Sequence, residues 1–169
     1  AKTKLKIQLQ IMEKINCMIS HTEYEIINKK NRLIGYMPIK KNLKYDNLIY
    51  SCDIGLSTVI IKKNIFDNQK YEFANLKTKE DYVLWLKLAF DAIEMKGIDQ
   101  YLTSWRKNKD SLSSSTIQKL IDGYKVYRVY LGYGVFKSLF CLTVLSINFI
   151  LKNWYDFFLF ININYMCFV

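Results

Sequence analysis

Proline, glycine, histidine and paired cysteines are all scarce in this 169-residue sequence. One proline and six glycines argue against a loop-rich or fibrous chain. His21 is the only histidine, which excludes a metal site built on several imidazoles. The four cysteines include no C-x-x-C pair, so they indicate reduced thiols in a cytoplasmic protein rather than a zinc site.

Arginine is rare too, although the formal net charge is +10. Only Arg32, Arg106 and Arg128 are arginines, and the lysines are spread along the chain. Arginine forks dominate the recognition of bases and phosphates, so nucleic-acid binding is only weakly indicated. An anionic membrane surface or a phosphate-bearing ligand accounts for the charge equally well.

An apolar helix with an acidic start is the most informative stretch. Thr78 and Asp81 have the spacing of a capping box, and the pattern predicts a helix from about 79 to 96 that stops at Gly97. Its surface is apolar all round, which predicts burial. Glu80 and Asp81 lie in its first turn, where the helix dipole favours ionised carboxylates. The two acids either only cap the helix or supply a general base.

The remaining pattern predicts an α/β domain of about 113 residues followed by helices. Alternation around a polar turn predicts a hairpin of strands at 18–27 and 32–36, and β-branched residues predict a buried strand at 55–61. The other expected elements are helices at 3–17, 46–50 and 116–133 and a strand at 98–105.

The C-terminal part is aromatic and apolar. Tyrosines recur at every third position from Tyr124 to Tyr133, and Lys125 and Arg128 are interleaved with them. This pattern fits a helix packed on the domain or one at a membrane interface. The uncharged run 138–151 is shorter than the ~20 residues of a membrane span, so a surface or buried helix is favoured. Residues 154–169 form an apolar tail of uncertain origin.

Several short motifs occur in a characteristic order. They are Lys4-Leu5 with Gln8, the hairpin at 20–28, Ser57-Thr58-Val59, Glu80-Asp81 with Trp85-Leu86, Arg106 with Ser111-Leu112-Ser113, Lys125-Val126-Tyr127-Arg128 and Lys137-Ser138-Leu139. Together they resemble family 2 glycosyltransferases of the GT-A fold, over roughly residues 3–152. The bacterial enzymes that build teichuronic-acid, capsular or lipopolysaccharide chains look most similar.

The resemblance implies inverting transfer of a sugar from a nucleotide-sugar donor to a glycan or lipid-linked acceptor, at the inner face of the cytoplasmic membrane. It makes Asp81 the catalytic base and Glu80 its supporting acid. The implied acceptor-binding residues are Ser57, Thr58 and Trp85. The implied donor-phosphate residues are Arg106, Ser111 and Ser113, in a loop where Trp105 replaces the usual tyrosine.

The family's Asp-x-Asp metal motif and its nucleotide-binding half do not occur in this sequence. The complete enzyme is expected to use Mg²⁺ or Mn²⁺, with no metal ligands in this chain. Residues 1–113 therefore correspond to the acceptor side of a GT-A domain, and 114–153 to a membrane-proximal helical region. The chain is expected to be an inactive fragment. The alternative function is a non-enzymatic basic module that binds membrane or nucleic acid.

Overall fold

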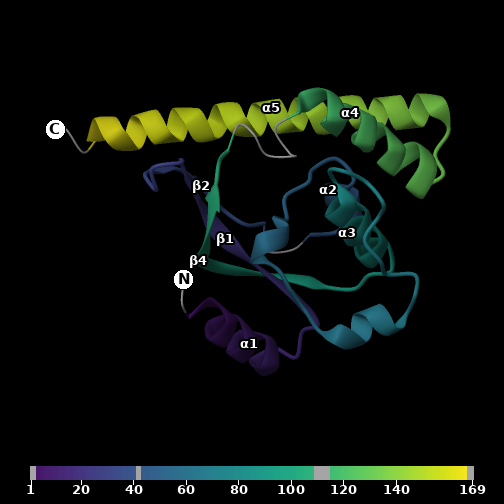
Figure 1. Ribbon diagram of the computed structural model, residues 1–169, viewed down its shortest axis with the longest axis horizontal. Helices are drawn as coiled ribbons and strands as arrows, with labels where there is room; N and C mark the ends of the chain where they lie inside the picture. Colours follow the sequence, from purple (N-terminus) through teal and green to yellow (C-terminus); the bar gives the residue numbers. More distant parts are fainter. Residues whose placement is uncertain (1–2, 41–42, 109–114, 167–169) are drawn as a thin grey trace.

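The computed structural model describes residues 3–40, 43–108 and 115–166, with side chains described through Lys152. A small mixed sheet lies in the middle, α1 (Lys4–Lys14) packs beneath it, and the long helix α5 (Val135–Met166) runs along the top (Figure 1). This arrangement confirms the predicted mixture of helices and strands. The predicted boundary between the domain and the helical region, at 113/114, lies outside the described residues.

The sheet is built around β1 (Ile19–Ile27). One edge of β1 pairs in parallel with β4 (Met95–Arg106) along its whole length. Its other edge pairs antiparallel with β3 (Ile60–Ile61) at the start and β2 (Leu33–Met37) at the end. The β1–β2 hairpin was predicted correctly. The Asn28 carboxamide oxygen accepts from the backbone N–H groups of Lys30 and Arg32, which closes the turn.

The predicted buried strand at 55–61 is wrong over most of its length. Leu56–Thr58 form a 3₁₀ turn, η1, and only Ile60–Ile61 pair as a strand. Both the backbone N–H and the hydroxyl of Thr58 donate to the Gly55 carbonyl, at 2.9 and 2.7 Å. These local bonds outweigh the β propensity of the sequence, because Thr side chains that bond to nearby backbone offer an alternative to the sheet ladder. A second 3₁₀ segment, η2 (Lys63–Asp67), follows β3.

The central helix α3 (Glu80–Phe90) is shorter than predicted. It ends at Asp91, and Ala92 has a positive φ of 56° that turns the chain towards β4. Gly97, the predicted helix stop, lies inside β4. A Cβ atom there would lie 2.6 Å from Ile39 Cδ1 and 3.3 Å from the Lys40 carbonyl oxygen. Close packing beside the strand, rather than a helix end, therefore explains this glycine.

The predicted burial of the central helix is confirmed. Its fully buried side chains are Tyr82, Val83, Leu84, Trp85, Leu86 and Leu88. The Tyr82 hydroxyl donates to the carbonyl of Leu48, at the end of α2 (Tyr45–Leu48), at 2.6 Å. The Tyr127 hydroxyl donates to the Ile49 carbonyl at 2.6 Å. Buried phenols of this kind need partners, and the backbone carbonyls after α2 supply them.

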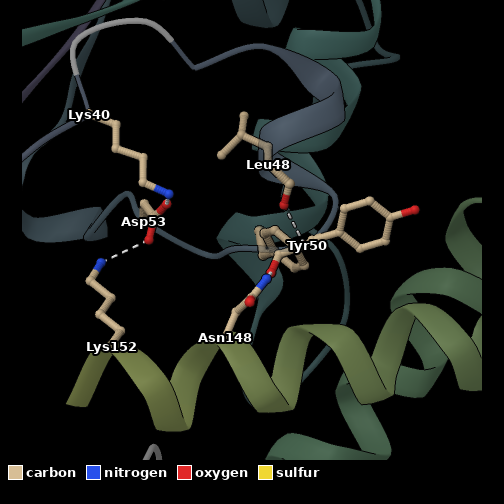
Figure 2. Close-up of polar contacts among 7 residues, drawn as sticks. Lys40, Leu48, Tyr50, Asp53, Asn148 and Lys152 are labelled. Carbon is tan, nitrogen blue, oxygen red and sulfur yellow. Dashed lines mark hydrogen bonds and ion pairs between the residues drawn. The ribbon is translucent and has the colours of Figure 1, made fainter. Parts of the chain in front are cut away.

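The C-terminal helices pack onto this core. α4 (Thr116–Lys125) starts at Ser115, whose hydroxyl accepts from the Gln118 N–H, and continues into a π-helical turn, η4 (Val126–Tyr130). α5 is joined to the domain near its middle: Asn148 Nδ2 donates to the Tyr50 carbonyl at 3.0 Å, and Lys152 Nζ lies 2.8 Å from Asp53 Oδ1 (Figure 2). The inward side of α5 therefore belongs to the folded domain.

Candidate active site

A cleft of about 420 Å³ opens where the start of α3 meets η1 and the end of β4. Its walls are formed by Tyr24, Gly55, Leu56, Ser57, Thr58, Lys77, Thr78, Lys79, Glu80, Asp81, Thr103 and Trp105. Ser57 and Thr58 are far from Glu80 and Asp81 in sequence, and the fold brings all four to one hollow. These four are predicted site residues.

Asp81 is the chemically distinctive group of the cleft. Burial, with the neighbouring Glu80 charge, raises the pKa of its carboxyl to about 6. From the sequence, the helix dipole was expected to favour the ionised carboxylate, whereas burial acts in the opposite direction and has the larger effect on the pKa. Bonds from the backbone N–H groups of Asp81 and Tyr82 oppose the rise but do not reverse it. The carboxyl is still mostly ionised at pH 7 and can accept a proton close to neutrality.

The predicted capping box does not form. The residue preceding α3 is Lys79, in the left-handed conformation with φ 64°, and its side chain makes no cap hydrogen bond. Thr78 instead turns to α4: its N–H and its hydroxyl each donate to Asp122 Oδ2 at 2.9 Å. Asp122 is 1% exposed, and its hydrogen bonds to Gln118 and Thr78 outweigh burial, so its pKa lies below the usual range. A buried carboxylate on α4 thus positions the loop that leads into the first turn of α3, where Asp81 lies.

The opposite wall is held from below by α1. Gln8 is completely buried, and its Nε2 donates to the Ser20 carbonyl and hydroxyl and to the Thr58 carbonyl, at 3.1, 2.9 and 3.0 Å. Thr58 is 2% exposed, whereas Ser57 is exposed to solvent. Ser57 therefore presents its hydroxyl to the cleft, and Thr58 supports the turn.

Other predicted site residues do not line the cleft. Trp85 is 0% exposed and lies in the core beneath the acidic turn. Arg106 follows Trp105 on β4, and successive side chains of a strand point to opposite faces. Trp105 lines the cleft, while Arg106 Nη2 donates to Asn31 Oδ1 at 2.8 Å. Ser111 and Ser113 lie outside the described residues, so the donor-phosphate role stays a prediction.

Comparison with known proteins gives this geometry a context. No family model matches the chain. It is 30% identical over 118 residues to WfgD of Escherichia coli, a UDP-Glc:α-D-GlcNAc-diphosphoundecaprenol β-1,3-glucosyltransferase, over 69% of this chain and 45% of WfgD. It is 25% identical over 153 residues to TuaG of Bacillus subtilis, assigned to teichuronic acid biosynthesis, over 90% of this chain and 60% of TuaG. An uncharacterized glycosyltransferase of Rickettsia felis is 31% identical over 107 residues, 62% of this chain and 17% of that protein.

These relatives are glycosyltransferases. The resemblance inferred from the motifs is thereby confirmed, including its link to teichuronic-acid synthesis. The chain spans about half the length of WfgD and TuaG, at 45% and 60%. Their activities therefore bear on this chain as proposals rather than as established properties.

Several cleft residues were not predicted as site residues. Lys77 and Lys79 flank the start of α3, and Tyr24 and Thr103 line the wall formed by the sheet. The Thr103 hydroxyl is buried and finds no hydrogen-bond partner among the described residues. The two lysines could have been found from sequence, because both lie within the three residues that precede the acidic pair. Tyr24 and Thr103 depend on the parallel pairing of β1 with β4, which the local pattern does not indicate.

The residues at the cleft do not make a set of metal ligands. Within the described part of the chain, no group of three or more His, Cys, Asp or Glu side chains is placed to hold a metal ion. Glu80 and Asp81 are adjacent in one helical turn, and Mg²⁺ needs near-octahedral oxygen coordination. Mg²⁺ or Mn²⁺ stays a prediction for the complete glycosyltransferase, and these residues are given no role in holding it.

Proposed function

We propose that this chain is the acceptor side of a GT-A glycosyltransferase of family 2, acting in cell-surface polysaccharide synthesis. The enzyme transfers a sugar from a nucleotide-sugar donor, with inversion, to a hydroxyl of a glycan or lipid-linked acceptor. The observation that carries this proposal is the Asp81 carboxyl, with its pKa near 6, on the wall of the 420 Å³ cleft. The similarity to WfgD and TuaG supports the same reaction class.

In this proposal Asp81 acts as general base. The acceptor hydroxyl oxygen attacks the anomeric carbon of the donor sugar, its proton passes to Asp81, and the bond from that carbon to the nucleoside diphosphate breaks. A base with a pKa near the working pH combines an available ionised form with useful basicity. Glu80 supports it, because the Glu80 charge contributes to the raised pKa.

The other cleft residues bind and orient the substrates. Ser57 offers a hydroxyl to the acceptor sugar, and Trp105 offers an aromatic surface. Lys77 and Lys79 place positive charge beside the acids, which suits a diphosphate on either substrate. Trp85, on the buried side of α3, anchors the helix in the core and does not contact the substrates.

Turnover by the 169-residue chain alone is not expected, because its sequence contains no Asp-x-Asp motif. The enzyme is proposed to work at the inner face of the cytoplasmic membrane. None of the relatives described above supports the alternative of a non-enzymatic nucleic-acid-binding module.

The test uses a fusion in which the unmatched part of WfgD supplies the rest of the enzyme. It is assayed with UDP-glucose and a GlcNAc-diphosphoprenol acceptor, the substrates in the name of WfgD. We expect transfer by the fusion, its loss in Asp81→Asn, and none by the chain alone. A folded Asp81→Asn fusion that transfers at the parent rate would overturn the base role. A folded fusion that transfers no sugar would contradict the proposed reaction, and transfer by the chain alone would refute its dependence on a missing half.

A further inference from the structure

The outward side of α5 is apolar although it faces solvent. Its outer face is defined here as Phe136, Phe140, Ile147, Ile150 and Leu151, which are 89, 61, 49, 56 and 60% exposed. Positions that differ by three, four or seven residues lie on the same side of a helix, so this set forms one stripe. Its one polar member is Thr143, whose hydroxyl donates to the Leu139 carbonyl at 2.9 Å. An apolar stripe of this length on a solvent-facing helix marks an interaction surface.

The same helix has a second stripe that packs on the domain. Ser138, Cys141 and Leu145 are buried there. Further along this stripe, Asn148 Nδ2 bonds to the Tyr50 carbonyl and Lys152 Nζ pairs with Asp53 (Figure 2). The outer face is therefore not the core side of a helix that has swung away from the domain.

The charges around the outer face favour an anionic partner. Between residues 115 and 152 the only acidic residue is Asp122, which is 1% exposed and hydrogen-bonded to Thr78 and Gln118. The basic residues of this region are Lys119, Lys125, Arg128 and Lys137, together with Lys152, whose charge is already paired with Asp53 on the inward side. Lys119 Nζ lies 5.5 Å from the ring of Phe149, an exposed aromatic side chain of α5 outside the outer face, so positive charge lies beside the apolar helix. An apolar helix face in a region whose exposed charges are basic matches the boundary between anionic headgroups and acyl chains.

We propose that the outer face of α5 lies on an anionic lipid bilayer, with the helix in the membrane plane. The segment Val135–Lys152 is also long and apolar enough to cross a bilayer, with a mean hydropathy of 1.7. A crossing helix would have to leave the domain. That would break the Asn148 and Lys152 contacts and take the Asn148 side chain into hydrocarbon, where an unpaired polar group is costly. The docked helix keeps those contacts and buries only its apolar side.

This placement deepens the proposed function, on which it rests only for the choice of acceptor. Thr78, on the cleft wall, is bonded to Asp122 of α4. α4 in turn packs closely on α5, where a Cβ atom on Gly123 would lie 2.8 Å from Leu142 Cδ1. The membrane-bound helix thus fixes the position of the candidate cleft through direct contacts, and a lipid-linked acceptor reaches the cleft from the bilayer.

The first experiment is vesicle flotation of the purified 169-residue chain. Vesicles of 70:30 phosphatidylcholine and phosphatidylglycerol are compared with pure phosphatidylcholine. We expect the chain to float with the anionic vesicles, and Phe140→Ser/Ile147→Ser/Ile150→Ser to lower the partition coefficient by about tenfold or more. Leu5→Ser/Leu9→Ser is the matched control, because these side chains are exposed at 63 and 46% and belong to α1, which lies on the other side of the sheet from α5 (Figure 1). Equal flotation of the outer-face variant and the parent would overturn the proposal.

A charge variant tests the proposal independently of the apolar variant, so the test stands even where the apolar variant does not fold. Lys119→Glu/Lys137→Glu changes two side chains on the surface of the helices, and near-ultraviolet circular dichroism checks its fold. Each lysine near an anionic surface contributes about fivefold to binding, so we expect a loss of at least about 25-fold on anionic vesicles. Unchanged binding would contradict the role of charge. A parent chain that stays unbound and forms a dimer that the outer-face variant disrupts would instead assign the surface to a second copy.

Alkaline carbonate extraction distinguishes a helix that lies on the bilayer surface from one that crosses the bilayer. The bound chain should be released from the vesicles, whereas a crossing helix would remain and overturn the in-plane placement. Binding of a soluble GlcNAc diphosphate to the chain is measured in parallel. Loss of vesicle binding with retained ligand binding would refute the membrane surface and leave the proposed function standing, and the reverse result would refute the function alone.

Discussion

The side-chain amide of Gln8 donates to the carbonyl oxygen of Thr58 at 3.0 Å, which joins α1 to the turn that forms one wall of the cleft. The same nitrogen also reaches the Ser20 carbonyl and hydroxyl on β1. One buried amide therefore ties three segments together, although they are distant in sequence.

Replacing Gln8 by alanine should destabilise the domain by about 2–3 kcal/mol. The substitution leaves a cavity and removes the donor from the buried Thr58 carbonyl and Ser20 hydroxyl. Urea denaturation measures the free energy of unfolding. Gln10→Ala, on the exposed side of the same helix, is the control and should change it by less than about 0.5 kcal/mol. Similar values for the two variants would contradict the proposed role of Gln8.

Asp81→Asn in the complete enzyme should lower kcat by roughly 10²–10⁴-fold, because proton removal is lost. Glu80→Gln should cost less, since its role is to support Asp81. The activity of the parent enzyme should fall as the pH drops below about 6, where Asp81 becomes protonated. A pH profile without this limb, in a variant series with unchanged kcat, would leave Asp81 a structural residue only.

The same substitution should stabilise the fold. The folded pKa of Asp81, about 6, lies above its ordinary value of 3.8, so the folded state holds a proton that the unfolded state releases between about pH 4 and 6. The free energy of unfolding therefore falls as the pH rises through that range. Asp81→Asn should be more stable than the parent by about 3 kcal/mol at pH 7, and this difference should vanish as the pH falls to about 3. Chemical denaturation at both pH values measures the difference, and a destabilised variant at pH 7 would contradict the raised pKa.

Asp53 should show the opposite dependence on pH. Burial alone would raise the pKa of its carboxyl, but the Lys152 charge and the hydrogen bonds from Lys152, Lys40 and Ser51 lower it to about 2. Stability from this group is present above pH 4 and is lost as the pH falls towards 2. Asp53→Asn should cost about 2 kcal/mol at pH 7, with the gap closing at pH 2. Thermal denaturation between these limits tests this, and a constant gap would rule out the ionic origin.

Gly97→Ala should destabilise the domain by about 1–2 kcal/mol, because the new methyl group would displace the end of the Ile39 side chain, 2.6 Å away, and crowd the Lys40 carbonyl oxygen at 3.3 Å. Gly35→Ala on β2 is the control. Its nearest atom would be Ile26 Cδ1 at 3.7 Å, an ordinary contact, so the change should stay within about 0.5 kcal/mol. Urea denaturation of the two variants measures the change in the free energy of unfolding, and equal changes would contradict the prediction.

Local signals were read correctly where the chain folds on its nearest neighbours. The β1–β2 hairpin and the burial of α3 follow from alternation, turn residues and a run of large apolar side chains. Long-range contacts decided the errors. Thr78 was expected to cap α3, but Asp122, distant in sequence, takes its hydroxyl. Gly97 was expected to end a helix, but it lies inside β4, where the Ile39 side chain and the Lys40 carbonyl pack closely against it.

The candidate site divides in the same way. Glu80 and Asp81 stand out within one turn of sequence, and Ser57 and Thr58 came from the resemblance; all four line the cleft. Thr103 and Trp105 reach it because β4 pairs in parallel with β1, a partner remote in sequence. The raised pKa of Asp81 could not be predicted from the sequence, because the dipole is a local effect, whereas burial depends on the whole fold.

The parallel pairing of β1 with β4 also determines how the domain can assemble. The Ser104 hydroxyl donates to the Glu25 carboxylate across a separation of 79 residues. The two strands must therefore be brought together, with the chain between them closed into a loop, before the seam between β1 and β4 can form. Closing so long a loop is entropically costly and is not rewarded until the pairing is made, which slows folding. The candidate cleft lies across this seam, with Tyr24 on one strand and Thr103 on the other. During synthesis the cleft therefore forms only after β4 has emerged. A protease cut that detaches β4 would remove one wall of the cleft.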